Sequence, residues 1–460
     1  MAQSDGGCDP GVQPAVPQTL FGSKGEAQIM KTLFPAVALM AALGAVLSGA
    51  RAADIDWPQF RFDDQRNGVN KFETVLTKKN VPFLNEAWRA QLGDIVDFSS
   101  PVVVGGVVYI GTVDGTLWAY PADGCGQFFC STPLWQSTSL AQIRDTPAVA
   151  NGVVYVGSQT DDDDNDGKLN AFSAAGCGET VCAPLWQGDA GPDSILESSP
   201  AVAGGVVYVG AFDGKLYAFD AAGCGAALCQ PLWTGRTGGS IESSPVVYKG
   251  HVYIGSDDGK LYVFRAGGCG KAACKAQWTG TIGIAPFQSS PAIAKGTVYI
   301  AGQHALAAFD AKGCGAKSCA PLWQAPDGGE FFNGSPAVSG DTVYIAWSTG
   351  LAAYAAGGCG SSSCDKQWIL FGDGAQAAIV SSPTVANGVV YAGRNTGEVL
   401  AWKAGPCGQF VCHQIWKGLT HEPIVSSSPT VVNGKVYVGS ADDLVEEDIS
   451  GRIYVFSLSP

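Results

Sequence analysis

The stretch SSPAVAGGVVYVGAFDGKLYAFDAAGCGAALCQPLW, residues 198–233, decides the fold. Its apolar and β-branched residues form short runs separated by turn residues, and they lack the 3.6-residue spacing that favours a helix. Gly204-Gly205 is typical of a two-residue hairpin turn, and FDGK gives a second turn. The stretch predicts four antiparallel strands: SSPAV, VYVG, LYAF and a last strand that ends at Trp233.

This unit recurs eight times, about every 47 residues. A tyrosine within a Val-Tyr pair recurs at Tyr109, Tyr155, Tyr208, Tyr253, Tyr299, Tyr344, Tyr391 and Tyr437. A proline after Ser or Thr recurs at Pro101, Pro147, Pro200, Pro245, Pro291, Pro336, Pro383 and Pro429. A tryptophan recurs at Trp88, Trp135, Trp186, Trp233, Trp278, Trp323, Trp368 and Trp416. Eight copies of a four-stranded antiparallel unit predict an all-β fold, an eight-bladed β-propeller.

The two ends of the repeat array predict how the propeller closes. The last copy ends at RIYVFSLSP, residues 452–460, without a tryptophan strand, whereas Trp88 stands before the first Ser-Pro pair. We expect the Trp88 strand to complete the last blade, since closure removes open sheet edges. Residues 53–80 are then a lead-in, and residues 81–460 form the propeller.

Fourteen of the fifteen cysteines form seven C-x4-C pairs. The pairs are Cys125-Cys130, Cys177-Cys182, Cys224-Cys229, Cys269-Cys274, Cys314-Cys319, Cys359-Cys364 and Cys407-Cys412. A metal would need further ligands near each pair, and no histidine recurs with them. Seven redox dithiols on one fold would be unusual. We therefore predict seven disulfides that hold the turn before each tryptophan strand.

The N-terminal region predicts export. MKTLFPAVALMAALGAVLSGARA, residues 30–52, has a lysine, an apolar stretch and an Ala-Arg-Ala cleavage site, as a signal peptide has. We expect translation to start at Met30 and the upstream Cys8 to be absent from the exported protein, which is then periplasmic or secreted. A net charge of −14 argues against nucleic acid or an anionic membrane as partner. No second apolar segment could span a membrane, and we expect a monomer.

The repeat resembles that of the pyrroloquinoline-quinone-type propellers. Ala218, Asp220, Gly223 and Trp233 match the docking pattern of that family, and DWPQFRFDDQRNG, residues 56–68, is similar to its lead-in. The resemblance covers residues 56–460 and implies the propeller fold. Members of the family include quinoprotein alcohol dehydrogenases, polyvinyl-alcohol dehydrogenases and a non-catalytic outer-membrane assembly lipoprotein. This sequence lacks the adjacent cysteines of the alcohol dehydrogenases and the C-x-x-C-H haem motif of their cytochrome-bearing relatives.

Polar residues are expected to meet at one mouth of the propeller axis, on the face that we call the top. The residues that precede the Ser/Thr-Pro positions start the inner strands there; they are Phe98, Arg144-Asp145, Glu197, Glu242, Gln288, Asn333, Val380 and Ser426. Such a set could hold a cation or a polar ligand, or it could be a solvated channel rim. The family resemblance implies, for an enzyme, Asp145 as base and Glu197 and Asn333 as calcium ligands beside the quinone.

Two acidic insertions lie in equivalent loops of the second and last repeats. In SQTDDDDNDGKLN, Asp162, Asp164 and Asp166 followed by Gly167 fit a calcium loop, although no helix flanks it. SADDLVEEDISG, residues 440–451, is the second insertion. The alternative is a solvated acidic loop.

These observations favour an exported, non-catalytic binding or scaffold propeller that takes a protein or small-molecule ligand at its top face. The alternative is an alcohol dehydrogenase that depends on pyrroloquinoline quinone and calcium and acts on alcohols, including polymeric ones. The absence of adjacent cysteines and of a haem motif favours the scaffold function, whereas the charged axial rim leaves the dehydrogenase function as an alternative.

Overall fold

The computed structural model describes residues 55–159, 167–191, 197–283, 289–326, 331–347, 350–372, 377–442 and 450–459. These residues belong to one compact unit, 52–460. Among them, no helix is long and apolar enough to cross a membrane. One short 3-10 helix, η1 (Val81–Phe83), stands among strands.

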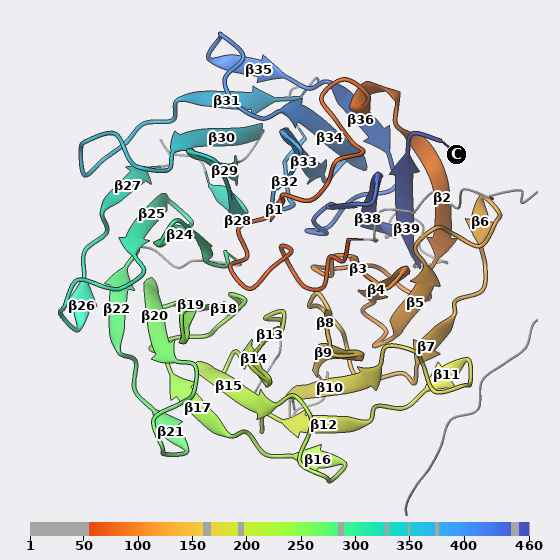
Figure 1. The fold of residues 1–460 in the computed structure, drawn as a ribbon, viewed down its shortest axis with the longest axis horizontal. Helices are drawn as coiled ribbons and strands as arrows, with labels where there is room; N and C mark the ends of the chain where they lie inside the picture. Colours follow the sequence, from red (N-terminus) through yellow and green to blue (C-terminus); the bar gives the residue numbers. More distant parts are fainter. Residues whose placement is uncertain are drawn as a thin grey trace, which may run out of the picture. The chain divides into compact units, whose positions relative to one another are not determined.

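Eight sheets surround a common axis, as Figure 1 shows in the view along it. The strands of blades 1 to 4, from the axis outward, are β3 (Val102–Val104), β4 (Val107–Gly111), β5 (Leu117–Pro121), β7 (Trp135–Ser137); β8 (Ala148–Ala150), β9 (Val153–Gln159), β10 (Gly167–Ser173), β12 (Trp186–Asp189); β13 (Ala201–Ala203), β14 (Val206–Gly210), β15 (Lys215–Asp220), β17 (Trp233–Arg236); and β18 (Val246–Tyr248), β19 (His251–Ser256), β20 (Lys260–Arg265), β22 (Trp278–Thr281).

Blades 5 to 8 repeat the same order and complete the predicted eight-bladed propeller. The expectation that the outer strand ends at the tryptophan is wrong, because in blades 1 to 7 this strand begins there, from Trp135 to Trp416. Their strands are β23 (Ala292–Ala294), β24 (Thr297–Gly302), β25 (Ala305–Asp310), β27 (Trp323–Pro326); β28 (Phe332–Ser339), β29 (Thr342–Trp347), β30 (Gly350–Ala355), β31 (Trp368–Phe371); β32 (Thr384–Ala386), β33 (Val389–Arg394), β34 (Glu398–Lys403), β36 (Trp416–Leu419); and β37 (Thr430–Val432), β38 (Lys435–Asp442), β39 (Ser450–Ser457), β2 (Asn85–Gln91).

The closing strand is the one that the sequence predicts. β2 pairs antiparallel with β39, so that Trp88 lies opposite Val455 and the N-terminal region completes the last blade. Trp88 is 3% exposed and belongs to the apolar cluster between blades 8 and 1. Closure therefore depends on a strand that precedes all the others of its blade by more than 300 residues.

All seven predicted disulfides are present, and each cysteine loop also reaches the preceding blade. The second cysteine of six loops belongs to a short strand that pairs parallel with the tryptophan strand of the preceding blade; these strands are β6 (Phe129–Cys130), β11 (Val181–Cys182), β16 (Leu228–Cys229), β21 (Ala273–Cys274), β26 (Ser318–Cys319) and β35 (Val411–His413). The seventh loop pairs through Ser363 and Gln324. Figure 1 shows the labelled short strands at the outer rim. The loops thus fasten neighbouring blades together as well as closing their own turns.

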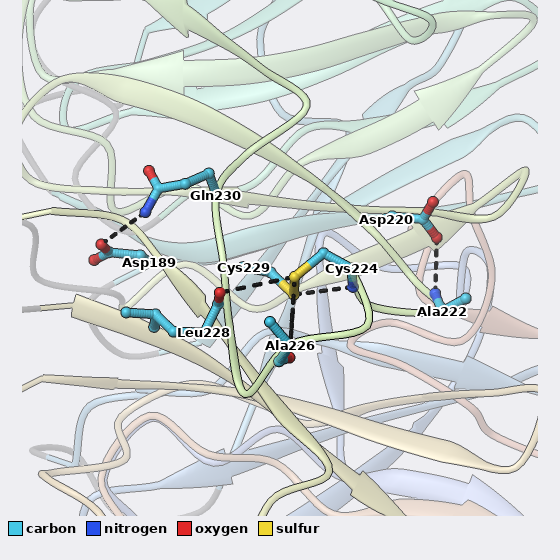
Figure 2. Close-up of a disulfide and its surroundings, with 8 residues drawn as sticks. All are labelled: Asp189, Asp220, Ala222, Cys224, Ala226, Leu228, Cys229 and Gln230. Atoms are coloured by element: carbon cyan, nitrogen blue, oxygen red, sulfur yellow. Dashed lines mark hydrogen bonds between the residues drawn. A yellow bond between two sulfur atoms is a disulfide. The ribbon is translucent and has the colours of Figure 1, made fainter. Parts of the chain in front are cut away.

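The Cys224–Cys229 loop shows how this fastening works (Figure 2). The Cys224 N–H donates to Cys229 Sγ over 3.0 Å within the loop. Just beyond it, Gln230 Nε2 donates to Asp189 Oδ2 of the preceding blade over 3.1 Å. The tight turn also needs Gly223, whose φ is +78° and whose α-carbon faces the preceding blade's Trp186: a Cβ there would lie 2.8 Å from the indole Cδ1. The glycine and tryptophan of the family pattern therefore meet between blades rather than within one.

A ring of hydrogen bonds joins all eight inner strands near the axis. The residue before each proline donates its backbone N–H to the side-chain hydroxyl of its counterpart in the next blade, over 2.9 to 3.1 Å; the order is Ser100, Thr146, Ser199, Ser244, Ser290, Ser335, Ser382, Ser428 and back to Ser100. At each of these positions the side chain must be short enough to fit between two inner strands and must accept a hydrogen bond from the preceding blade. A Ser or Thr hydroxyl meets both requirements. This explains why Ser or Thr precedes every proline of the column.

The first part of the lead-in, residues 55–70, runs across the inner strands and contacts every blade. In Figure 1 it is the red segment at the centre. Its backbone and side chains bond to β3 at Val103, β8 at Val149, blade 3 at Pro200, β18 at Val247, β23 at Ile293, β28 at Val338, β32 at Val385 and β37 at Val431. β1 (Val69–Asn70) pairs parallel with β32. The lead-in therefore obstructs the channel that eight inner strands would otherwise leave.

Candidate functional site

A cavity of about 350 Å³ opens at the propeller axis above the serine ring. Four serines of that ring line it, together with two glutamates and several apolar side chains; the lining residues are Phe60, Phe98, Glu197, Ser199, Glu242, Ser244, Ser290, Gln303, Phe331, Phe332, Gly334, Val380, Ser382 and Ser426. Phe60 belongs to the lead-in. The cavity is thus built from the inner strands of several blades and from the segment that obstructs the channel.

Most of the residues that the sequence predicts for the axial mouth come together here. Phe98, Glu197, Glu242, Val380 and Ser426 all line the cavity. Two predicted members cannot be placed: Gln288 lies outside the described residues, and the side chain of Asn333 is not described, although its backbone belongs to β28.

Arg144 lies beside the cavity and is held by two carboxylates. Its Nη1 is 3.5 Å from Glu197 Oε1, and its Nε is 3.8 Å from Asp97 Oδ2. Burial raises the pKa of Asp97 to about 6, against the effect of Arg144, and it also raises the pKa of Glu197. Arg144 is therefore already engaged with acidic neighbours of this chain.

Glu242 is the carboxylate of the cavity without such a partner. Its Oε2 is inaccessible to solvent and accepts no hydrogen bond from the described residues. Burial and, to a smaller extent, the nearby acidic groups Asp257 and Glu197 together raise the pKa of Glu242 to about 8. The group is thus largely protonated at neutral pH.

The raised pKa of Glu242 predicts a pH-dependent stability. The folded protein keeps this proton between the ordinary pKa of 4.5 and about 8, whereas the unfolded chain releases it. Stability from this group is therefore present at low pH and lost as pH rises through that window. We expect Glu242→Gln to raise the free energy of unfolding relative to wild type by about 1–2 kcal/mol at pH 8.5 and by much less at pH 5, after a discount for partial exposure.

Urea denaturation at both pH values measures this difference. Glu179→Gln, which removes a carboxylate from an exposed position on a cysteine loop, is the matched control and should leave the pH dependence unchanged. If the free energy of unfolding of Glu242→Gln changed between pH 5 and 8.5 by the same amount as that of wild type, the raised pKa of Glu242 would be contradicted.

Asp145 occupies a different environment from the cavity residues. It is fully buried, and its Oδ2 accepts the Gly157 N–H over 2.6 Å. In six other blades a neutral atom makes this bond: Oγ of Ser99, Ser198, Ser243, Ser289, Ser381 and Ser427 accepts the equivalent N–H. Burial raises the pKa of Asp145 well above its ordinary value. The aspartate thus holds the inner hairpin of blade 2 as serine does elsewhere, and its proposed role as a base remains a prediction.

Two buried arginines of the lead-in lie beside Phe60. The guanidinium carbons of Arg61 and Arg66 are 6.0 and 5.5 Å from the centre of the Phe60 ring. Their Nη2 atoms donate to backbone carbonyls: Arg61 to that of Pro336 and Arg66 to those of Ser199 and Pro200. Burial lowers the pKa of each to about 9, so both remain charged at neutral pH. They fix the lead-in against the inner strands.

Several residues that line the cavity were not predicted from the sequence. No repeated column of the sequence contains these residues, which are Phe60, Gln303, Phe331 and Phe332. Phe60 lies in the lead-in, which precedes the repeats. Asp97 could have been noticed, because it directly precedes Phe98 of the axial column.

The calcium loop stays a prediction. Asp162, Asp164 and Asp166 lie outside the described residues, as does most of the second insertion. Within the described residues, no group of three or more His, Cys, Asp or Glu side chains is placed so that it could hold a metal ion.

Comparison with known families identifies one match. Three overlapping segments of the chain, residues 85–282, 134–357 and 183–404, match the model of a family described as outer membrane protein assembly factor BamB. No curated protein matches the sequence.

Solved structures share the fold at low identity. The crystal structure of BamB from Moraxella catarrhalis is similar with a TM-score of 0.58 and 16% identity, over 81% of this chain and 97% of that chain. Quinohemoprotein alcohol dehydrogenase from Comamonas testosteroni gives a TM-score of 0.65 and 14% identity, over 88% of this chain and 80% of that one. A europium-containing methanol dehydrogenase gives 0.60 and 13%, over 87% and 98%. At such identities the likeness concerns the fold alone.

Proposed function

Because the chain belongs to the family described as outer membrane protein assembly factor BamB, we propose that it is an exported, non-catalytic binding propeller that takes its ligand or partner at the axial mouth. The seven disulfides and the family are consistent with a location outside the cytoplasm. Fold alone does not assign a function, so the proposal depends on the site.

One observation carries the non-catalytic proposal: the described residues that line the axial cavity include two glutamates and no basic side chain. Pyrroloquinoline quinone, the cofactor implied by the dehydrogenase alternative, carries several carboxylates and would need cationic partners. Arg144 beside the lining is already paired with Asp97 and Glu197. Arg61 and Arg66, beside Phe60, donate to backbone carbonyls and fix the lead-in. Among the described residues that line the cavity, no tryptophan is present to stack on a quinone ring. The residues present therefore do not fit that group.

The acidic lining is the one feature that favours the dehydrogenase alternative. Glu197 and Glu242 could supply oxygen ligands to a cation, as the resemblance to quinoprotein dehydrogenases implies. Two carboxylates alone fall well short of the six to eight oxygens that calcium prefers. The alternative thus needs ligands beyond the described lining.

Reconstitution distinguishes the two functions. Purified protein is mixed with pyrroloquinoline quinone and calcium, and quinone binding and dye-linked oxidation of primary, secondary and polymeric alcohols are measured. We expect neither saturable binding nor turnover. Alcohol oxidation that is lost in Glu197→Gln and kept in Glu179→Gln would overturn the non-catalytic proposal.

A further inference from the structure

The axial cavity combines two features that rarely face one ligand by chance. Its walls carry aromatic rings from three places in the chain: Phe60 of the lead-in, Phe98 before blade 1, and Phe331 with Phe332 at the start of blade 6. Carboxylates of Glu197 and Glu242 face the same space. Aromatic faces and carboxylates both attract positive charge, whereas apolar walls repel a strongly hydrated ion.

Among the described residues, no basic group forms an ion pair with Glu242, and Arg61 and Arg66 beside Phe60 donate instead to backbone carbonyls. Arg144 accompanies Glu197 and Asp97, as their distances show. The charged groups that shift the pKa of Glu242 are Asp257 and Glu197, both acidic. Its Oε2 is shielded from water and lacks a donor among the described residues. A ligand in the cavity would not contact Oε2 itself, but a positive charge beside the Glu242 carboxylate would offset the negative charge of its ionised form.

The size and chemistry of the walls select among cations. A volume of about 350 Å³ lies at the lower end of the range for small-molecule pockets, enough for a compact organic ion. A divalent metal would need more oxygen ligands than the two glutamates supply. An anion would meet two carboxylates, and the described part of the lining offers it no basic side chain. Alkyl groups on a cation, by contrast, suit the phenylalanine rings and Val380.

We propose that the axial cavity binds an alkylated ammonium ion, with its charge beside Glu242 and its alkyl groups against the phenylalanine rings. This inference rests on the proposed binding function and names the ligand class of that site. Binding is coupled to loss of the Glu242 proton, so affinity rises as pH increases toward and past 8.

Choline and its uncharged analogue 3,3-dimethylbutan-1-ol, which have nearly the same shape, form the test pair in isothermal titration calorimetry on the purified protein. We expect saturable choline binding at pH 8.5, at least tenfold tighter than binding of the alcohol and several-fold weaker at pH 6.5. Glu242→Gln should weaken choline binding at least tenfold. Phe98→Leu, which keeps an apolar side chain and removes a ring, should weaken it several-fold, and Glu179→Gln should leave it unchanged.

Three results with the wild-type protein would overturn the inference: equal binding of choline and the alcohol, no choline binding by a protein whose thermal unfolding remains cooperative, or calcium that displaces choline at a lower concentration than choline itself requires. Neither of the first two results contradicts the proposed non-catalytic function. That function is contradicted only if the protein oxidises alcohols with the quinone. A Glu242→Gln variant that folds and binds choline as wild type does would also overturn it.

Discussion

Reduction of all seven disulfides is expected to remove most of the stability of the folded protein. Each bridge closes a loop between cysteines five residues apart, and the chain-entropy model gives roughly 2 kcal/mol for such a loop. Seven bridges at well-separated sites add to on the order of 15 kcal/mol, comparable with the whole stability of a typical domain. We expect the reduced protein to be unfolded or to unfold at a far lower guanidinium concentration.

The measurement compares guanidinium unfolding curves of the oxidised protein with those of protein reduced and alkylated under denaturing conditions and then returned to buffer. Mass spectrometry establishes how many of the paired cysteines carry the alkyl group. Cys224→Ser/Cys229→Ser, which removes one bridge, should lose about 2 kcal/mol and keep a single cooperative transition. Reduced protein with an unchanged midpoint would show that strand pairing between the cysteine loops and preceding blades suffices by itself.

Trp88→Ala is expected to cost about 3–5 kcal/mol of unfolding free energy. The indole is 3% exposed and packs against Gly124, where a Cβ would lie 2.8 Å from the indole Cδ1. Because β2 closes the last blade, the loss also loosens the contact between the two ends of the array. Thermal and urea unfolding measure the effect.

Two variants separate closure from simple loss of a side chain. Phe83→Ala, at a residue 69% exposed just before β2, should change stability by less than about 0.5 kcal/mol. Trp233→Ala removes the same type of indole from blade 3, where it packs against Gly268 in the same way. If Trp88→Ala costs less than 1 kcal/mol, the role of β2 in closure is contradicted. If Trp88→Ala and Trp233→Ala lower the free energy of unfolding by the same amount, the closing position of Trp88 adds no stability beyond the packing that both tryptophans share.

The axial cavity was partly predictable because its acidic members belong to a repeated column. Glu197 and Glu242 stand at one position of successive repeats, and equal strand registers bring equal positions to the same end of the axis. Asp145 lies one position later, yet that single step places it in the interior, where it accepts the Gly157 N–H.

The sequence by itself determined the blades, their number, the disulfide pairs and the closing strand. Each of these depends on spacing within one repeat or on a count of repeats, and local spacing is readable without coordinates. Only the tertiary structure decided that residues 55–70 obstruct the channel, that cysteine loops pair with preceding blades, and that Phe60 and Phe331 meet Glu242 in one cavity. The lead-in has no repeat signal, and its contacts join residues as far apart as Asn70 and Val431. Closure of the ring brings such distant segments of the chain together. Their separation along the sequence therefore does not predict whether they are in contact.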